Sequence, residues 1–255
     1  MGLEKYQEKR NFQKSPEPKG DESKARRSRK RKALFFCVQK HLASHLHYDL
    51  RLEHNGVLLS WAVPKGPSLD PSVKRFAAQV EDHPIEYGTF EGVIPEGYGA
   101  GIVMLWDSGT WVSESPDVDA ALAKGELKFS TDGYKLKGSW VLVRTRGYDK
   151  RGETSSKPSW LLIKHKDEWA GDLEITEFAP LSVKSGDDFP AIMAAQDPKL
   201  WISNRDAKGG AKGSDAKGGA AGVMLREIIE EAAKLKLADL NKPKSRGKRT
   251  NKSTA

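Results

Sequence analysis

The chain has 255 residues, enough for one large domain or two small ones, and 43 basic against 35 acidic side chains give it a net charge of +8. Its mean hydropathy is −0.63, and its apolar stretches fall far short of the roughly 20 residues that cross a bilayer, so we expect no membrane span. A single cysteine, Cys37, excludes an intrachain disulfide, and we expect a cytoplasmic location.

The positive charge is concentrated at the two ends of the chain. Residues 1–32 contain 12 basic and 5 acidic side chains, residues 33–205 contain 19 and 24, and residues 206–255 contain 12 and 6, so the net charges are +7, −5 and +6. We expect residues 1–32 to form a basic, partly flexible arm, because the run Lys24–Lys32 offers nothing to bury. Such an arm either is solvated and keeps the protein soluble or binds phosphates, and the sequence favours neither interpretation.

Residues 33–170 have the pattern of an all-β domain. Short segments rich in Val, Leu, Phe, Tyr and Trp alternate with Gly, Pro and Asp clusters, which is typical of strands and turns. The pattern predicts two-residue turns at Asn55-Gly56 and Asp132-Gly133 and a helical insert at Asp117–Lys124. It favours a small, closed or nearly closed β-barrel of about eight strands, with a sandwich as the alternative. The predicted strands are 34–39, 45–53, 57–62, 75–81, 101–107, 126–130, 135–144 and 160–165.

The rest of the chain is less regular. We expect an irregular extension over residues 171–205 and a Gly/Lys linker over 206–222, in which a six-residue repeat is too rich in glycine to fold. Residues 223–240 place apolar side chains at a 3.6-residue period, which predicts an amphipathic helix that packs on a partner or back on its own domain. Residues 241–255 form a second basic tail.

Metal-ligating side chains gather around the predicted strand 45–53. Side chains two apart share a face of a strand, so the apolar side chains of this strand should face the core. The polar and charged side chains on the opposite face are His45, His47, Asp49, Arg51 and Glu53. His47 and Asp49 are close enough to bind one cation, and His41 would add a second imidazole. Two imidazoles and a carboxylate suit Mn, Zn or Fe, and the planar fork of Arg51 suits phosphate. A polar strand with histidine spacers is the alternative, but three histidines in this stretch favour a site.

Two further segments carry polar or glycine-rich motifs. In the turn Glu81–Gly88, His83 is a candidate general acid or phosphate donor and Tyr87 a candidate hydrogen-bond donor. The segment Gly92–Gly101 is rich in glycine, but no Lys-Ser/Thr pair follows it and the next segment is a predicted strand. We therefore expect a tight turn between strands here.

Four motifs in order resemble one known family. They are Gln39-Lys40-His41 with the run Ser44–Glu53, Ser60–Asp70, Val80–Pro84 with Tyr87, and Phe90–Gly101. Together they closely resemble the 3′-phosphoesterase domain of bacterial DNA ligase D, over about residues 6–166. Because the ligase and polymerase domains of that multidomain protein are absent from this chain, it looks like a stand-alone form.

The resemblance implies a manganese-dependent β-barrel enzyme, with other divalent transition metals left open. Such a domain removes a 3′-terminal ribonucleoside as a phosphodiesterase and a 3′-phosphate as a phosphomonoesterase, leaving a 3′-hydroxyl for end joining. It implies DNA 3′ ends and primer-templates as partners, together with a DNA ligase or end-joining factor, and a monomeric state.

The resemblance also implies site residues. The metal ligands would be His41, His47 and Asp49, and the catalytic groups that contact phosphate would be Arg51, His83 and Tyr87. Further family positions that shape the substrate site would be Gln39, Glu53, Lys65, Arg75 and Glu81. In the leading segment Arg10 and Glu17 would serve the phosphomonoesterase step, and Asn11 stands where the family usually has Asp.

Two alternatives come from other classes of protein. A non-haem iron oxygenase would use His47, Asp49 and His83 as a facial triad, although Arg51 on the same face favours a phosphate. A DNA-end-binding module without catalysis would grip DNA through the tails and recruit a ligase through the helix at 223–240.

Overall fold

The computed structural model describes residues 2–21, 33–145, 159–196 and 220–240. The basic run Lys24–Lys32, most of the predicted linker and the predicted tail lie outside the described residues. Within the described ranges, no helix is long and apolar enough to cross a membrane.

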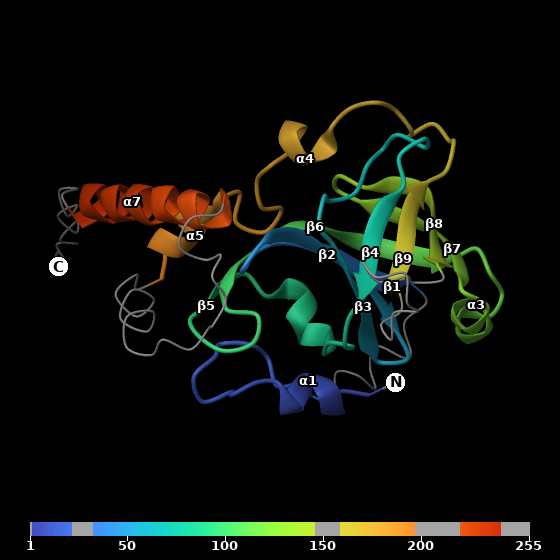
Figure 1. Ribbon diagram of the computed structural model, residues 1–255, viewed down its shortest axis with the longest axis horizontal. Helices are drawn as coiled ribbons and strands as arrows, with labels where there is room; N and C mark the ends of the chain where they lie inside the picture. Colours follow the sequence, from blue (N-terminus) through green and yellow to red (C-terminus); the bar gives the residue numbers. More distant parts are fainter. Residues whose placement is uncertain (1, 22–32, 146–158, 197–219, 241–255) are drawn as a thin grey trace, which may run out of the picture.

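The strands form one antiparallel sheet that closes on itself (Figure 1). Its order is β1-β2-β3-β4-β9-β8-β7-β6, and β6 pairs again with β1, so eight strands make a closed barrel while β5 pairs on the outside of β6. The predicted barrel is confirmed, and β5 is a short strand within the segment expected to be a turn. The strands are β1 (Leu34–Leu42), β2 (Leu46–His54), β3 (Val57–Val63), β4 (Arg75–Gln79), β5 (Gly92–Ile94), β6 (Gly101–Ser113), β7 (Glu126–Gly133), β8 (Lys137–Thr145) and β9 (Ser159–Lys164).

The predicted turn at Asn55-Gly56 joins β2 to β3. His54 pairs with Val57, and the two turn residues have φ of 49° and 86°, which is the positive-φ pair that a tight two-residue hairpin needs. Only glycine and a few polar residues reach this region without strain. This hairpin sets the register in which Arg51 lies opposite Ser60.

The second predicted turn, at Asp132-Gly133, is wrong. Strand β7 continues through Gly133, and the chain reverses over residues 134–136 before β8 begins. Gly133 pairs with Gly109 of β6, and a Cβ on it would lie 2.6 Å from both Asp107 and Phe36. Gly133 is therefore needed because it lets the side chains of Asp107 and Phe36 approach the backbone closely, and it does not adopt a positive φ.

The helices are short, apart from one at the end of the chain. The predicted insert is α3 (Val118–Lys124): Asp117 caps it by accepting a hydrogen bond from the Ala120 amide, and Gly125, at φ 89°, ends it. The others are α1 (Glu4–Glu8), the 3-10 helix η1 (Ile85–Thr89), α4 (Ile175–Phe178), α5 (Phe189–Ala194) and α7 (Ala220–Leu240).

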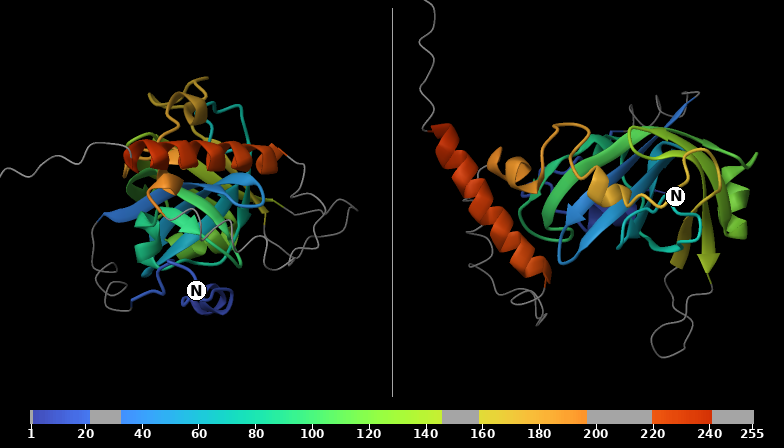
Figure 2. Two further views of the ribbon diagram at one scale, coloured as in Figure 1. Left: turned by 90° about the vertical axis from the view of Figure 1, so that its left-hand side faces the viewer. Right: turned by 90° about the horizontal axis from the view of Figure 1, so that it is seen from above.

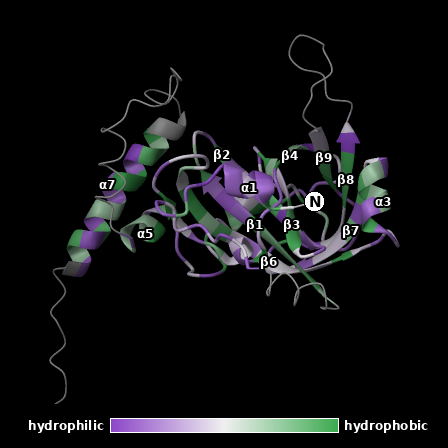
Figure 3. Ribbon diagram, turned by 90° about the horizontal axis from the view of Figure 1, so that it is seen from below, coloured by the Kyte–Doolittle hydropathy of each residue, from purple (hydrophilic) through white to green (hydrophobic). Residues whose placement is uncertain are grey.

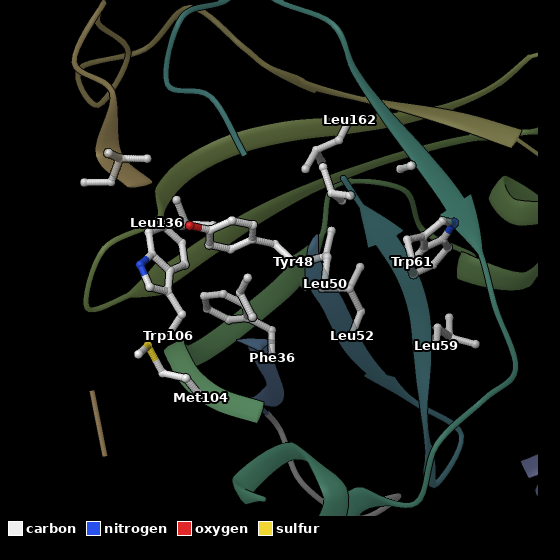
Figure 4. Packing of buried hydrophobic residues seen from close by; sticks show 14 of the residues in the cluster. Phe36, Tyr48, Leu50, Leu52, Leu59, Trp61, Met104, Trp106, Leu136 and Leu162 are labelled. Carbon is white, nitrogen blue, oxygen red and sulfur yellow. The ribbon is translucent and has the colours of Figure 1, made fainter. Parts of the chain in front are cut away.

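The core fills the interior of the barrel (Figure 4). Tyr48, Leu50 and Leu52 of β2 point into it, so the alternation predicted for this strand is confirmed. Each aliphatic side chain of this size stabilises the fold by about 1.5–3 kcal/mol when buried. Five tryptophans are also fully buried or nearly so: Trp61, Trp106, Trp111, Trp140 and Trp160.

A second, smaller apolar cluster lies on the outer face of the barrel. Tyr6, Leu58 and Tyr87 are buried in it, and they come from α1, β3 and η1. The Tyr6 hydroxyl donates a hydrogen bond to the carbonyl of Pro18 at 2.6 Å. Residues 2–21 are therefore folded against the barrel, and Figure 3 shows α1 in front of the sheet, beside β1.

The C-terminal helix packs beside α5 at one end of the molecule (Figure 2). The predicted amphipathic helix is confirmed, although α7 begins at Ala220, three residues earlier than expected. Its buried side chains Leu225, Ile228 and Ala232 are spaced along one face. They belong to the same core cluster as Phe189 and Ile192 of α5, so the helix packs on its own domain.

Candidate metal centre and phosphate site

The candidate site lies on the outer face of β1, β2 and β3. The antiparallel register places His41 opposite His47 and Gln39 opposite Asp49. Because side chains two apart share a face, the period of β2 adds Arg51 to this group, and β3 supplies Ser60 opposite it. The site therefore consists of neighbouring side chains on three strands.

The three predicted metal ligands come together. One donor atom from each of His41, His47 and Asp49 lies within 4.8 Å of the others. His41 Nδ1 and His47 Nε2 are each 3.7 Å from a different oxygen of the Asp49 carboxylate. This spacing leaves room for a cation between the donors.

Backbone carbonyls set the orientation of both imidazoles. His41 Nε2 lies 3.0 Å from the carbonyl of Gly99, and His47 Nδ1 lies 2.9 Å from that of His45. A carbonyl only accepts, so these nitrogens carry the protons, and in a neutral ring the nitrogens facing Asp49 have free lone pairs. Burial lowers the pKa of His47, which favours the neutral form. The donor set thus fits a divalent transition metal.

Asp49 and Arg51 form a buried ion pair, with Asp49 Oδ2 accepting from Arg51 Nη2 at 3.0 Å. Burial alone would raise the pKa of Asp49, but the adjacent Arg51 guanidinium counteracts burial, and that pKa lies well below its ordinary value. The carboxylate is therefore ionised, as a metal ligand must be.

Arg51 is held by two more hydrogen bonds. Its Nε donates to Gln39 Oε1 at 2.7 Å and its Nη1 to Ser60 Oγ at 2.9 Å. The amide of Gln39 donates in turn to the carbonyls of Tyr87 and Phe90. Gln39 therefore connects the guanidinium to η1, whose Tyr87 ring lies 4.9 Å from it.

His83 is a buried imidazole next to Ser60. Its backbone pairs with Leu58 in an isolated bridge beside β3. Its Nδ1 donates to the carbonyl of Glu81 at 2.8 Å, and its Nε2 accepts from Arg10 Nη2 at 3.2 Å, since an arginine only donates. Burial, aided by the charges of Arg51 and Arg10, lowers the pKa of His83 well below its ordinary value.

The N-terminal segment contributes an ion-pair cluster next to His83. Arg10 Nε contacts Glu17 at 2.8 Å and Arg10 Nη1 contacts Glu81 at 3.1 Å, while Lys9 reaches the other oxygen of Glu81 at 2.9 Å. The Arg10, Glu17 and Glu81 side chains are all at least 95% buried. Burial opposes the ionisation of Glu81, but its hydrogen bonds to Lys9 and Arg10 lower its pKa.

The remaining predicted residues differ in position. Glu53 is fully buried and accepts a hydrogen bond from the Phe35 amide, two positions along β2 from Arg51. Arg75 pairs with Glu174 at 3.2 Å, and Lys65 is exposed beyond β3. Among the described residues, no hydrogen bond or ion pair connects either of these two cations to the site.

Sequence reasoning missed two members of the site. Ser60 accepts from Arg51 and lies 3.3 Å from His83 Nδ1; the signal was a single hydroxyl in an otherwise apolar strand. The carbonyl of Gly99, which orients His41, gives no signal in the sequence because every residue has one.

The fold and the donor set together define the class of protein. It is a closed antiparallel β-barrel with a candidate metal centre on its outer face, next to a buried arginine and a neutral histidine. Residues 39–144 match the family described as the DNA ligase D 3′-phosphoesterase domain. Over these residues, which hold most of the barrel, the chain belongs to this family.

Several curated proteins are similar to the chain. It is 52% identical over 175 residues to the multifunctional non-homologous end joining protein LigD of Pseudomonas aeruginosa, covering 68% of this chain and 19% of that protein. The proteins of the same name from Mycobacterium bovis and Mycolicibacterium smegmatis are 49% and 37% identical, over 44% and 72% of this chain and 15% and 23% of theirs. The chain thus spans less than a quarter of the length of these relatives.

Proposed function

We propose that the barrel is a metal-dependent 3′-phosphoesterase that prepares DNA ends for joining. It would remove a 3′-terminal ribonucleoside and then the 3′-phosphate, leaving a 3′-hydroxyl, with Mn²⁺ as the cofactor. The observation that carries the proposal is the convergence of His41, His47 and Asp49 beside the buried Arg51. The relatives are named as end-joining proteins, which supports DNA ends as the substrate.

The three donors would hold the metal, which when bound would polarise a phosphoryl oxygen and lower the pKa of a bound water. Arg51 would bind the phosphate through its planar donor fork and neutralise charge that develops in the transition state. Its bonds to Gln39, Ser60 and Asp49 fix its orientation before substrate arrives, so little ordering is left to be done on binding.

His83 would act at Nε2, the nitrogen that faces Arg10. Because its pKa is low, the ring is neutral near pH 7, and Nε2 is free to accept a proton or a hydrogen bond once Arg10 turns to the substrate. The Tyr87 ring packs against His83 at 4.8 Å and would keep the imidazole in place.

Direct attack by water suits the site better than a covalent intermediate. The Ser60 hydroxyl lies 3.3 Å from His83 Nδ1, but it donates to the carbonyl of Leu58, accepts from Arg51 and is fully buried. The His83 Nδ1 beside it carries a proton, so it is not a base for Ser60.

The donor set by itself also suits a non-haem iron oxygenase. The structure pairs His41 with His47 and Asp49 and leaves His83 bonded to Arg10 and Glu81. The triad proposed for an oxygenase, with His83 as its third member, is therefore not the one that forms, and the family match favours phosphate chemistry.

The test is hydrolysis of defined ends. Purified protein is incubated with primer-templates ending in a 3′-ribonucleotide or a 3′-phosphate, with Mn²⁺, Zn²⁺ or Fe²⁺, and the products are resolved by electrophoresis. We expect both ends to become 3′-hydroxyls with Mn²⁺, and Arg51→Ala to lose this activity. Binding of both primers without any hydrolysis would instead identify a non-catalytic DNA-end-binding module.

A further inference from the structure

A hollow of about 220 Å³ lies between the N-terminal segment and the loop of residues 95–100 that follows β5. Lys9, Arg10 and Lys14 line one side of it and Glu96, Gly97 and Tyr98 the other. The candidate metal centre adjoins the hollow on the loop side, because the residue after Tyr98 supplies the carbonyl that orients His41. On the other side, Arg10 contacts His83.

Tyr98 presents an exposed ring at this hollow. Its exposed fraction is 51%, whereas Tyr6 and Tyr87, the aromatic residues packed around His83, are at most 2% exposed. The glycines on either side of Tyr98, Gly97 and Gly99, have φ of 90° and 80°, a backbone conformation that favours glycine. Tyr98 is therefore not part of the apolar packing.

Cations surround the ring. Lys9 Nζ lies 4.5 Å and Arg10 Cζ 5.6 Å from its centroid. Lys14 forms an ion pair with Glu96 at 2.7 Å, and both of these side chains are well exposed. An exposed aromatic ring set among lysines is how proteins bind single-stranded nucleic acid, because every base has a π-face and every linkage carries a phosphate.

We propose that Tyr98 stacks on the base of the 3′-terminal nucleotide of the substrate strand, while Lys9 and Lys14 neutralise the phosphates on its 5′ side. The inference rests on the proposed function, because the phosphate at the 3′ end is placed at Arg51. Stacking accepts any base, so Tyr98 selects for the presence of a base and is indifferent to its identity.

The experiment is a double-mutant cycle in which the Tyr98 ring is removed from the protein and the terminal base is removed from the DNA, separately and together. The proteins are the wild type, Tyr98→Ala, Tyr98→Phe and, as a matched control, Tyr134→Ala, which removes a 76% exposed tyrosine on the β7–β8 turn. The strands end in a 3′-phosphate on either a normal or an abasic nucleotide. Phosphate release gives kcat/KM, and fluorescence anisotropy without added metal gives affinity.

We expect Tyr98→Ala to reduce both quantities about 5- to 150-fold on the normal strand, the range that one stacked base contributes. Tyr98→Phe and Tyr134→Ala should match the wild type. On the abasic strand the wild type and Tyr98→Ala should be equal, because there is no base to stack.

An equal loss on both strands would overturn the proposal, since it would show that Tyr98 acts through Lys9 and Arg10. No loss on either strand would overturn it as well. If the wild type hydrolyses neither strand, the proposed function fails, and the anisotropy cycle still decides whether Tyr98 stacks on a base. Metal titration of each variant verifies that the barrel is folded.

Discussion

Arg10 Nη2 lies 3.2 Å from His83 Nε2, although 73 positions separate the two residues in the chain. The same guanidinium binds Glu17 and Glu81, so the N-terminal segment is fixed to the site by charge as well as by the apolar cluster around Tyr6. This relationship makes a segment outside the barrel part of the candidate site.

We expect Arg10→Ala to reduce release of a 3′-phosphate at least tenfold and removal of a 3′-ribonucleoside much less. The variant leaves the buried Glu17 carboxylate without its arginine and Glu81 with Lys9 as its remaining cation, and unpairing a buried charge costs about 3–5 kcal/mol. Product analysis on the two primers measures the ratio. Lys5→Ala, which removes an exposed cation of α1, is the control, and equal losses on both primers would contradict a specific role for Arg10.

We expect His47→Ala to abolish metal binding and hydrolysis together, because it removes one of three donor atoms from the site. His45→Ala removes an exposed imidazole whose hydrogen bond, within the described part of the chain, is to Ser44, and it should leave both unchanged. Calorimetric titration with Mn²⁺ and phosphate release measure the two properties. Metal affinity that survives in His47→Ala would show that the cation binds elsewhere.

We expect Asn11→Asp to increase release of the 3′-phosphate severalfold. The Asn11 side chain lines the hollow beside Arg10 and accepts a hydrogen bond from the Gln13 amide through Oδ1, a bond that an aspartate also accepts. The resemblance places Asp at this position. Gln13→Glu adds the same charge two residues away in the same turn and is the control, so a gain with both variants would be a general effect of charge.

The free energy of unfolding should depend on pH because of the ionisation of Asp107. Burial raises the pKa of this carboxyl from 3.8 to about 6, although its oxygens accept from the Lys135 and Leu136 amides. Between these two values the native state keeps a proton that the unfolded chain has lost, so the group's contribution to stability is present below pH 4 and falls as pH rises to 6.

The variant Asp107→Asn carries no charge at any pH. We expect its unfolding free energy to improve relative to the wild type by up to about 3 kcal/mol between pH 4 and pH 7, as measured by urea denaturation. Asp132→Asn, at an exposed carboxylate near the end of β7, should show no such trend. A constant difference for Asp107→Asn across this range would refute the interpretation.

Chains ending at residue 240 or at residue 205 should both lose DNA affinity at low salt and keep full metal affinity. The last fifteen residues contain six basic and no acidic side chains, whereas residues 206–240 contain six of each, so the salt dependence should change equally in both. Among the described residues, the main packing partner of α7 is α5, which carries none of the metal donors. Loss of metal binding in the shorter chain would show that the donors depend on α7.

Local pattern predicted most of the strands and the donor set. The alternation in β2 placed Tyr48, Leu50 and Leu52 in the core and left His47, Asp49 and Arg51 outside, because strand geometry alone decides which side chains share a face. The prediction of a turn at Asp132-Gly133 was wrong because a glycine can be required for either of two reasons, a positive φ or a close approach of neighbouring atoms. Local sequence does not distinguish them, and at Gly133 the reason is the close approach of Asp107 and Phe36.

The sequence by itself determined the all-β class, in which it favoured a barrel over a sandwich, and the +7, −5 and +6 distribution of charge. It also determined the pair His47 and Asp49, with His41 as a further candidate ligand, and the amphipathic helix. These follow from period and composition, which are local properties. Only the tertiary structure decided that β6 closes on β1, that the segment carrying Arg10 covers the outer face, and that Gly99 orients His41 while Tyr98 stays exposed. Each of these depends on contacts between residues far apart in the chain, whose pairing is set by packing and charge and leaves no periodic signal.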